Sequence, residues 1–392
     1  MRKIAIVIIF MINFCVFSQT ASFQVSYTGI TPQAQLAFEK ATEIWSNILI
    51  SNVPIKINLT WGDASSLGVL GITISNGIKD FSNAPYANVW YPSSLADALA
   101  GNDLQPSQTD MDIFMDSSSD WYYGTDGNCP FWKQDLVSCA LHEIGHGLGF
   151  YSVANINTQN EGSFSLQIDP FASALASFPL PNLNGEPLVY DLFVQNGQGS
   201  SLIDTNLFSN PSNLLANEFT GNDLYFAGPN TLAANNNNPA RIHATSAFSF
   251  GSSFLHLDES VYHSGTSESL MTPYSSAGEV NHLPGKITAG VLMDIGWNLA
   301  TAEIPQEEHF NSVICPNPIK EKATISFNVK KSSEVLIEMY NSIGMEVLPA
   351  LKKQAKVGLF SLEIETSSLC SGTYFFNITI DGALQKQLSV IK

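Results

Sequence analysis

The stretch CALHEIGHGLGFYS (residues 139–152) holds the residue pattern on which the interpretation of the whole chain depends. Residues four apart on an α-helix lie about 40° beyond a full turn and roughly 6 Å apart along the helix axis. His142 and His146 therefore project from one face, where two imidazoles can bind one metal ion. Glu143 lies beside them, in the position of a general base that takes a proton from water. The spacing predicts a zinc site with a hydrolytic function.

A catalytic zinc site needs a third protein ligand and leaves one position open for water. The common extended motif HExxHxxGxxH would place a third histidine at position 152, where this chain has Ser152. Either the HExxH motif is a chance match and the site binds no metal, or the third ligand comes from elsewhere in the chain. The candidates are Glu161 and four later histidines: His243, His256, His263 and His282. His309 is set aside because it falls in a predicted linker.

The stretch SSFLHLDESVYHSGTSESLMTPYSSAG (residues 252–278) places His256 shortly before SLMTP, which resembles the Met-turn of metzincins. HEIGHGLGF, this stretch and the closing VLMDIGWN follow one another in the order found in leishmanolysin-like metzincins, over roughly residues 133–300. In that family an inserted segment separates the zinc-binding helix from the third histidine. The chain resembles this family.

The resemblance implies an α+β metzincin-like zinc protease domain that binds one catalytic Zn²⁺. Carried over by position, it makes His142, His146 and His256 the zinc ligands and Glu143 the general base. Met271 becomes the Met-turn residue, with an ordinary core methionine as the alternative. His263 and His282 remain alternatives for the third ligand.

Two features depart from the family or stay open. No sizeable propeptide is expected between the signal and the first strand, so the latency device of the family is missing or different. Tyr274, just after the SLMTP sequence, is a candidate for transition-state support, and a packed turn tyrosine is the alternative.

The first residues predict export. Arg2 and Lys3 precede an apolar run from residue 4 to residue 17, which is shorter than the roughly 20 residues of a membrane span. We expect a signal peptide over residues 1–20 and no transmembrane segment after its removal. Four cysteines then remain in an oxidising compartment, and they predict a Cys129–Cys139 disulfide and, as a second candidate pair, Cys315 with Cys370.

The charge distribution divides the chain into two modules. Residues 21–311 carry six Lys and Arg against 28 Asp and Glu, whereas residues 312–392 carry nine against seven. Such acidity disfavours binding to nucleic acid or anionic membranes. It leaves room for structural Ca²⁺ but does not itself indicate calcium sites.

The order of elements predicts an α+β layer followed by an all-β domain. A capped helix over residues 31–51 lies between alternating strands, and a zinc protease domain is expected over residues 21–300. The polar TAEIPQEEHFN (residues 301–311) reads as a linker. Five alternating segments separated by glycine turns then predict a small immunoglobulin-like β-sandwich over residues 312–392.

The last module carries a second resemblance. VICPNPIKEKATISF, EMYNSIGMEV, LCSGTYFFNITI and KQLSVIK resemble, in order, the type IX secretion sorting domain of Bacteroidetes. The resemblance implies recognition by the type IX secretion machinery and a secreted or surface-attached protein. The sequence therefore predicts a secreted, monomeric zinc-dependent endopeptidase that acts on protein or peptide substrates. The alternative is a catalytically inactive, metalloprotease-like module for surface binding or adhesion.

Overall fold

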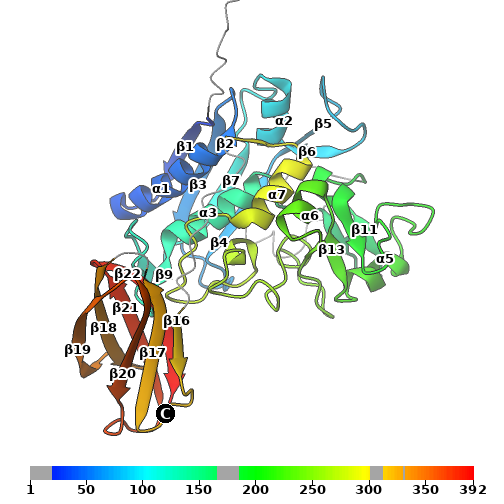
Figure 1. Cartoon of the computed structure of the whole chain (residues 1–392). Coiled ribbons are helices and arrows are strands. Elements are labelled where there is room, and N and C mark those ends of the chain that lie inside the picture. The colour runs from blue at the N-terminus through cyan, green and yellow to red at the C-terminus, as the bar shows by residue number, and fades with distance from the viewer. Residues whose placement is uncertain (1–19, 166–184, 301–311, 330–331) are drawn as a thin grey trace, which may run out of the picture.

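The computed structural model describes residues 20–165, 185–300, 312–329 and 332–392 (Figure 1). Two separate hydrophobic cores form within these residues, one made from residues 21–299 and the other from residues 314–390. The predicted linker and all but the last residue of the predicted signal peptide lie outside the described part. Within that part, no helix combines the length and the apolar character needed to cross a membrane.

The larger core is built on a four-stranded mixed sheet in which three strands run parallel and the edge strand runs antiparallel to them. In spatial order the strands are β1 (Phe23–Thr28), β3 (Ile55–Gly62), β7 (Met111–Asp116) and β4 (Gly71–Ser75). Among the described strands of this sheet, β4 pairs with β7 alone, so its outer side is a free edge.

Two long helices, α1 (Pro32–Ile48) and α3 (Leu136–Gly147), pack on the same face of this sheet. Side chains of paired strand residues point to the same face of a sheet. The register Tyr27–Leu59–Ile113–Thr73 therefore marks one face. Tyr27 contacts Phe38 of α1, and the Thr73 hydroxyl contacts the Glu143 carboxylate of α3.

Local capping explains where the two helices begin. The Thr31 hydroxyl accepts a hydrogen bond from the Ala34 amide, and Pro32 occupies the first turn of α1. The Asp135 carboxylate accepts from the Ser138 amide at 2.9 Å and so caps α3. The buried Trp45 of α1 donates its indole N–H to the Leu141 carbonyl at 3.0 Å, which fixes α3 against α1.

Shorter elements surround this layer, both between its main strands and after α3. The first group lies between the main strands: β2 (Leu49–Ile50), β5 (Gly77–Lys79), β6 (Trp90–Pro92), α2 (Ser93–Ala100), β8 (Trp121–Tyr122) and β9 (Gln134–Asp135). The second group follows α3: β10 (Ala154–Ile156), β11 (Gly162–Phe164), η1 (Val189–Phe193), β12 (Val194–Asn196), α5 (Asn213–Phe219), β13 (Leu224–Phe226), α6 (Pro229–Ala234), β14 (Ala240–Arg241), η2 (Ser269–Met271), α7 (Gly285–Ile295) and β15 (Asn298–Leu299).

The C-terminal residues form a sandwich of two antiparallel sheets, with strand orders β16-β17-β20 and β19-β18-β21-β22. Its strands are β16 (Ser312–Cys315), β17 (Lys322–Val329), β18 (Ser333–Asn341), β19 (Glu346–Ala355), β20 (Gly358–Glu365), β21 (Thr373–Ile380) and β22 (Ala383–Ile391). Sequence alternation had predicted five of these strands. It missed β16 and the exposed edge strand β19, because β19 has few buried side chains.

Candidate metal centre

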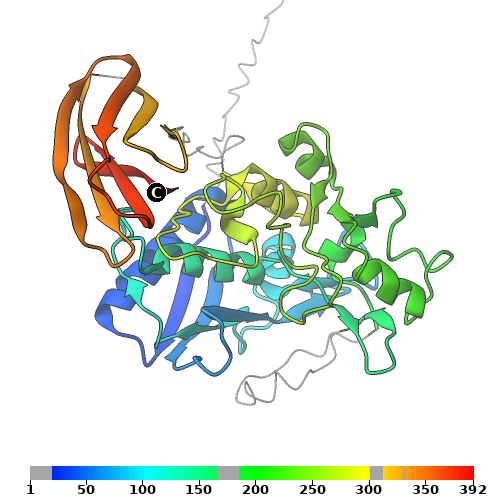
Figure 2. The same cartoon turned by 90° about the horizontal axis from the view of Figure 1, so that it is seen from below.

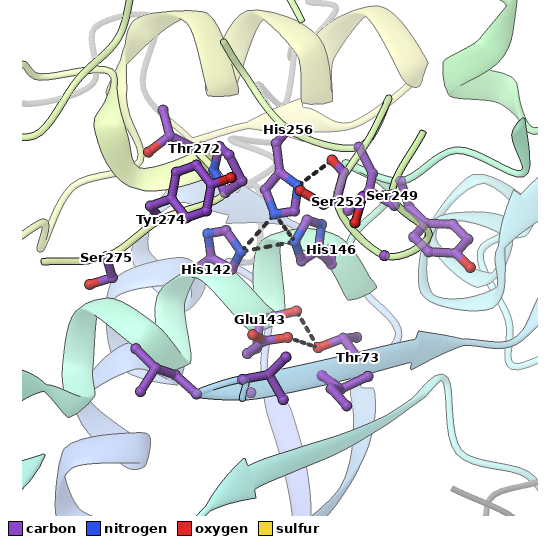
Figure 3. A pocket seen from close by; sticks show the side chains of 18 of the residues that line it. Thr73, His142, Glu143, His146, Ser249, Ser252, His256, Thr272, Tyr274 and Ser275 are labelled. Carbon is purple, nitrogen blue, oxygen red and sulfur yellow. Dashed lines mark hydrogen bonds between the residues drawn. The ribbon is translucent and has the colours of Figure 1, made fainter. Parts of the chain in front are cut away.

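Three histidines from distant parts of the chain meet in a cleft beside the edge strand β4 (Figure 3). His142 and His146 come from α3, and His256 comes from the segment before η2. The His146 Nε2 atom lies 2.9 Å from His142 Nε2 and 3.2 Å from His256 Nε2, and the remaining pair is also 3.2 Å apart. In the part of the chain that the structure describes, no other group of three or more His, Cys, Asp or Glu side chains lies close enough together to hold one metal ion.

Backbone carbonyls fix the tautomer of all three imidazoles. The Nδ1 atom of His142 lies 2.6 Å from the Leu270 carbonyl oxygen, and the Nδ1 atom of His146 lies 2.7 Å from that of Phe150. The Nδ1 atom of His256 lies 2.8 Å from the carbonyl oxygen of Ser252. A carbonyl only accepts, so each Nδ1 carries the proton and each Nε2 presents a lone pair to the other two.

This donor set fits a zinc ion. Three unprotonated nitrogens cannot donate hydrogen bonds to one another, and their lone pairs could be shared by one cation. Tetrahedral zinc with nitrogen ligands at about 2.0–2.1 Å implies separations of about 3.3 Å between those nitrogens. The observed separations of 2.9 to 3.2 Å are close to this value. His142, His146 and His256 are therefore the residues that would hold the ion.

Burial keeps the imidazoles neutral. It lowers the pKa of His146 to about 3, aided by the neighbouring His142, against the opposing effect of the bond to Phe150. Burial also lowers the pKa of His142, and it lowers the pKa of His256 well below the ordinary value. Neutral imidazole is the form that binds a metal.

Glu143 lines the same cleft as the three histidines, and its carboxylate points toward Thr73 of β4 (Figure 3). The Thr73 hydroxyl lies 2.8 Å from the Glu143 Oε2 and 2.9 Å from its backbone carbonyl oxygen. Burial raises the pKa of Glu143 to about 7, and the Thr73 hydrogen bond lowers it. A carboxyl with a pKa near neutrality suits both acceptance and release of a proton.

Gly71 makes room for this carboxylate. A β-carbon added at Gly71 would lie 2.6 Å from the Glu143 Oε1 atom and 2.7 Å from its Cγ atom. A side chain at position 71 would therefore displace Glu143. Sequence analysis missed both Gly71 and Thr73, although the alternation of GITIS was a signal for this short strand.

The cleft around the histidines has a volume of about 580 Å³. One side is lined by residues 67–74, which include all of β4 except Ser75. The other is lined by residues 269–270 and 272–275 together with Asn281. A third wall comes from residues 248–253. Within the lining, Glu143 is the one side chain that is acidic or basic apart from the histidines.

Ser152, at the position of the missing local histidine, anchors the segment that leads to His256. Its hydroxyl donates to the buried Asp191 carboxylate at 2.6 Å and accepts from the Ala154 amide at 3.0 Å. The neighbouring Tyr190 hydroxyl donates to the Phe254 carbonyl at 3.1 Å. Two hydrogen bonds therefore connect the end of the α3 motif, through η1, to the residues just before His256.

Met271 is fully buried and packs against α3. A β-carbon added at Gly145, between His142 and His146, would lie 2.8 Å from the Met271 sulfur. The Met271 carbonyl accepts from the Leu257 amide at 2.8 Å, so the same turn also holds the residue that follows His256.

No other described candidate for the third ligand belongs to the group of three histidines. Glu161 accepts a hydrogen bond from Asn157 in the turn between β10 and β11. His263 is exposed beside the Ser264 carbonyl, and His282 pairs with Asp135 at 2.8 Å. His243 is buried and hydrogen-bonded through its backbone to His256 and Phe254, and His309 lies outside the described residues.

Tyr274 lines the cleft with 64% of its surface exposed, its ring 6.3 Å from that of His243.

The predicted disulfides are wrong, because all four described cysteines are free. The Cys129 thiol is buried and donates to the Lys133 carbonyl at 3.3 Å, and burial raises its pKa to about 12. Cys139 lies in α3, where its side chain lines the cleft. Closeness in sequence misled the prediction, since helix geometry fixes the direction of Cys139. Cys315 and Cys370 are both exposed thiols.

Comparison with protein families finds two matches. Residues 313–392 match the family described as "Secretion system C-terminal sorting domain". The C-terminal sandwich is thus a type IX secretion sorting domain, and the protein is directed to the cell surface or the extracellular space. Residues 14–196 match the family described as "SPBPB7E8-like". The matched residues include α3 and its two histidines. A comparison with curated proteins gives no match.

Two solved structures are similar to short parts of the chain. A lipoprotein from Bacteroides thetaiotaomicron is 17% identical, with a TM-score of 0.16, over 23% of this chain and 83% of the other. A conjugate transposon protein from Bacteroides vulgatus is 15% identical, with a TM-score of 0.16, over 24% of this chain and 90% of the other.

Proposed function

We propose that the chain is a secreted, leishmanolysin-like zinc metalloendopeptidase of the metzincin type. The observation that carries the proposal is the convergence of three Nε2 lone pairs, each fixed by a carbonyl on Nδ1, beside the Glu143 carboxylate in an open cleft. A site that only stored metal would have no need of a buried acid with room reserved for it by Gly71. We therefore infer a hydrolytic site.

The zinc ion, when bound by His142, His146 and His256, supplies Lewis-acid chemistry that polarises a peptide carbonyl and makes water more acidic. Glu143 takes a proton from the attacking water and delivers it to the amine that leaves when the peptide bond breaks. Thr73 holds the carboxylate toward the cleft through its 2.8 Å hydrogen bond. The proton balance thus needs no further acid.

The position of β4 supports an extended polypeptide as the substrate. Its outer edge is unpaired among the described strands, and residues 67–74 line the cleft. An extended peptide can add to such an edge through main-chain hydrogen bonds, which do not depend on the side chains of the peptide. This favours cleavage within unfolded or extended segments over removal of single terminal residues. The export signal in the C-terminal domain would place such activity outside the cell.

The test compares hydrolysis of an unfolded protein by wild type, Glu143→Gln and Glu161→Gln, each loaded with zinc. Glu161 is a matched control because it lies in a turn away from the histidines. We expect Glu143→Gln to lose roughly 10²–10⁴-fold in rate, because loss of a general base costs that much. Glu161→Gln should retain activity, and a chelator should abolish it.

Equal rates for Glu143→Gln and wild type would overturn the proposed mechanism. No chelator-sensitive cleavage by any of the three proteins, with zinc bound, would support the alternative of a binding or adhesion module without turnover.

A further inference from the structure

The sorting domain presents an aromatic side chain where a sandwich strand normally carries a polar one. Along β21 the buried positions are Tyr374, Phe376 and Ile378, which point into the core of the sandwich. Phe375 lies between them and so points outward, to the face where strand residues are usually polar. Its ring is not left to solvent. It stacks on Phe131 of the N-terminal domain, with ring centroids 4.4 Å apart and an angle of 11° between planes.

The half-buried Phe131 and the exposed Trp132 form a turn between Cys129 and α3, which we call the aromatic turn. The Lys133 amide closes it by donating to the Pro130 carbonyl at 2.9 Å. A second part of the sorting domain contacts it, because a β-carbon placed at Gly344 would lie 3.8 Å from Trp132 and 3.9 Å from Phe131. Both overall views place the sandwich beside this end of α3 (Figures 1 and 2).

The same turn supports one wall of the cleft, the segment of residues 273–282. The Gly278 amide donates to the Lys133 carbonyl at 2.8 Å, and a β-carbon at Gly278 would lie 2.6 Å from the Phe131 Cα atom. The backbone of Gly278 is thus in close contact with the aromatic turn. Tyr274, Ser275 and Asn281 of this wall line the cleft.

The far end of the wall is tied to the start of α3. The Asn281 amide donates to the Ser138 hydroxyl at 2.7 Å, and His282 contacts Asp135 at 2.8 Å. Because Asp135 and Ser138 form the first turn of α3, the wall is held along its length by residues 133–138. A domain that packs on the aromatic turn therefore packs on the base of the wall.

We propose that the aromatic turn is an intramolecular docking surface for the sorting domain, with Phe375 as the principal contact. While docked, the sorting domain holds the cleft wall of residues 273–282 against α3. Release of the domain uncovers the Phe131 ring and lets the wall move. The inference concerns association and backbone protection, so it stands or fails independently of peptide hydrolysis.

The experiment uses the full chain with a recognition sequence for a site-specific protease inserted within residues 301–311. After cutting, size-exclusion chromatography tells whether the sorting domain stays bound, and titration of the separated parts gives the dissociation constant. Hydrogen exchange is followed in residues 130–134 and 276–281 of the uncut proteins. The variants are Phe375→Ser and Phe131→Ser, with Leu359→Ser as the control. Leu359 is an exposed apolar residue on β20, in the other sheet of the sandwich.

We expect the wild-type parts and the Leu359→Ser parts to elute together after cutting. Phe375→Ser and Phe131→Ser should each weaken association by tenfold or more, since buried aromatic contacts dominate interfaces. Both should also speed exchange in residues 130–134 and 276–281 of the uncut chain. Phe131→Ser leaves the sandwich unchanged, so weakened association in that variant cannot come from a misfolded sorting domain.

Separation of the wild-type parts on cutting, with exchange in both segments unaffected by Phe375→Ser, would overturn the proposal. So would an effect of Leu359→Ser as large as that of Phe375→Ser, because the contact would then have no specific place on the sandwich.

Discussion

The Ser152 hydroxyl donates a 2.6 Å hydrogen bond to Asp191. Ser152 stands where the extended motif would have its third histidine, and this bond begins a chain of contacts that leads to the segment with His256. Asp191 is fully buried, and its second oxygen accepts from the Leu188 amide at 2.9 Å. Tyr190 then reaches the Phe254 carbonyl, two residues before His256. Hydrogen bonds that begin at position 152 thus help to place His256 beside His142 and His146.

Replacing Ser152 by Ala removes a donor from the buried Asp191 carboxyl. We expect the free energy of unfolding to fall by about 1–3 kcal/mol, because Asp191 loses one of its donors and the Ala154 amide loses its buried acceptor. The folded variant should still bind zinc, since Ser152 touches no ligand nitrogen. Urea unfolding and metal analysis of the same samples check both statements, with the exposed Ser264→Ala as the control. Loss of zinc at unchanged stability would contradict this role.

His256→Ala should lower zinc from near one ion per chain to far below it, with the fold retained by circular dichroism. Two histidines alone leave the ion with half of its usual ligands. His263→Ala is the matched control, because His263 lies seven residues away in sequence and is exposed. Metal content by mass spectrometry gives the answer. Tight zinc in His256→Ala, and its loss in a His263 or His282 variant, would mean that the third ligand is misassigned.

The two histidines of α3 could be placed from the sequence because a helix fixes the geometry of residues four apart. His256 could be proposed only through the Met-turn resemblance, since 110 residues separate it from His146. Nothing local in the sequence specifies the Ser152–Asp191 and Tyr190–Phe254 hydrogen bonds that bring it back. Contacts between distant segments are set by packing, which a periodic pattern does not encode.

The edge strand β4 was missed for a related reason. It is only five residues long, its first residue is Gly71, and no residue before its last is fully buried. Strand β19 was missed because most of its side chains are exposed. Both are edge strands, whose weak patterns reflect burial on fewer sides. Cys129 and Cys139 are free because the fold, and not their spacing in the sequence, sets the directions in which their side chains point.

Gly71→Ala tests whether the carboxylate of Glu143 needs the space that Gly71 leaves. The added methyl would lie 2.6 Å from the Glu143 Oε1 atom, so the carboxylate must shift. Displacing a catalytic group by about 1 Å costs roughly a hundredfold in rate. Zinc content should stay near one, because no histidine is touched. Steady-state hydrolysis beside metal analysis separates these effects, and Gly372→Ala, with space at its β-carbon, is the control. Full activity of Gly71→Ala would show that Glu143 does not act from the observed position.

We expect the buried Asp110 to lower the free energy of unfolding as the pH rises. Burial raises the pKa of this carboxyl to about 7, with Asp97 and Asp103 contributing and the Lys56 amide opposing through a 2.7 Å hydrogen bond. An aspartate in the unfolded chain titrates near 3.9. Between about pH 4 and pH 7 the folded protein therefore binds more protons than the unfolded one, so the contribution of Asp110 to stability is complete below pH 4 and is lost as pH rises through 7.

Asp110→Asn should flatten this decline, because the amide oxygen can accept the same hydrogen bond from Lys56 without a charge to bury. We expect the loss of unfolding free energy between pH 5 and pH 8 to be smaller than in wild type by about 1–3 kcal/mol. Asp191 has its pKa raised to about 7 in the same direction, so wild type and variant should both decline, and their difference isolates Asp110. Urea unfolding at the two pH values measures it, with the exposed Asp63→Asn as the control. Parallel curves for wild type and Asp110→Asn would mean that Asp110 is already ionised in the folded protein at pH 5.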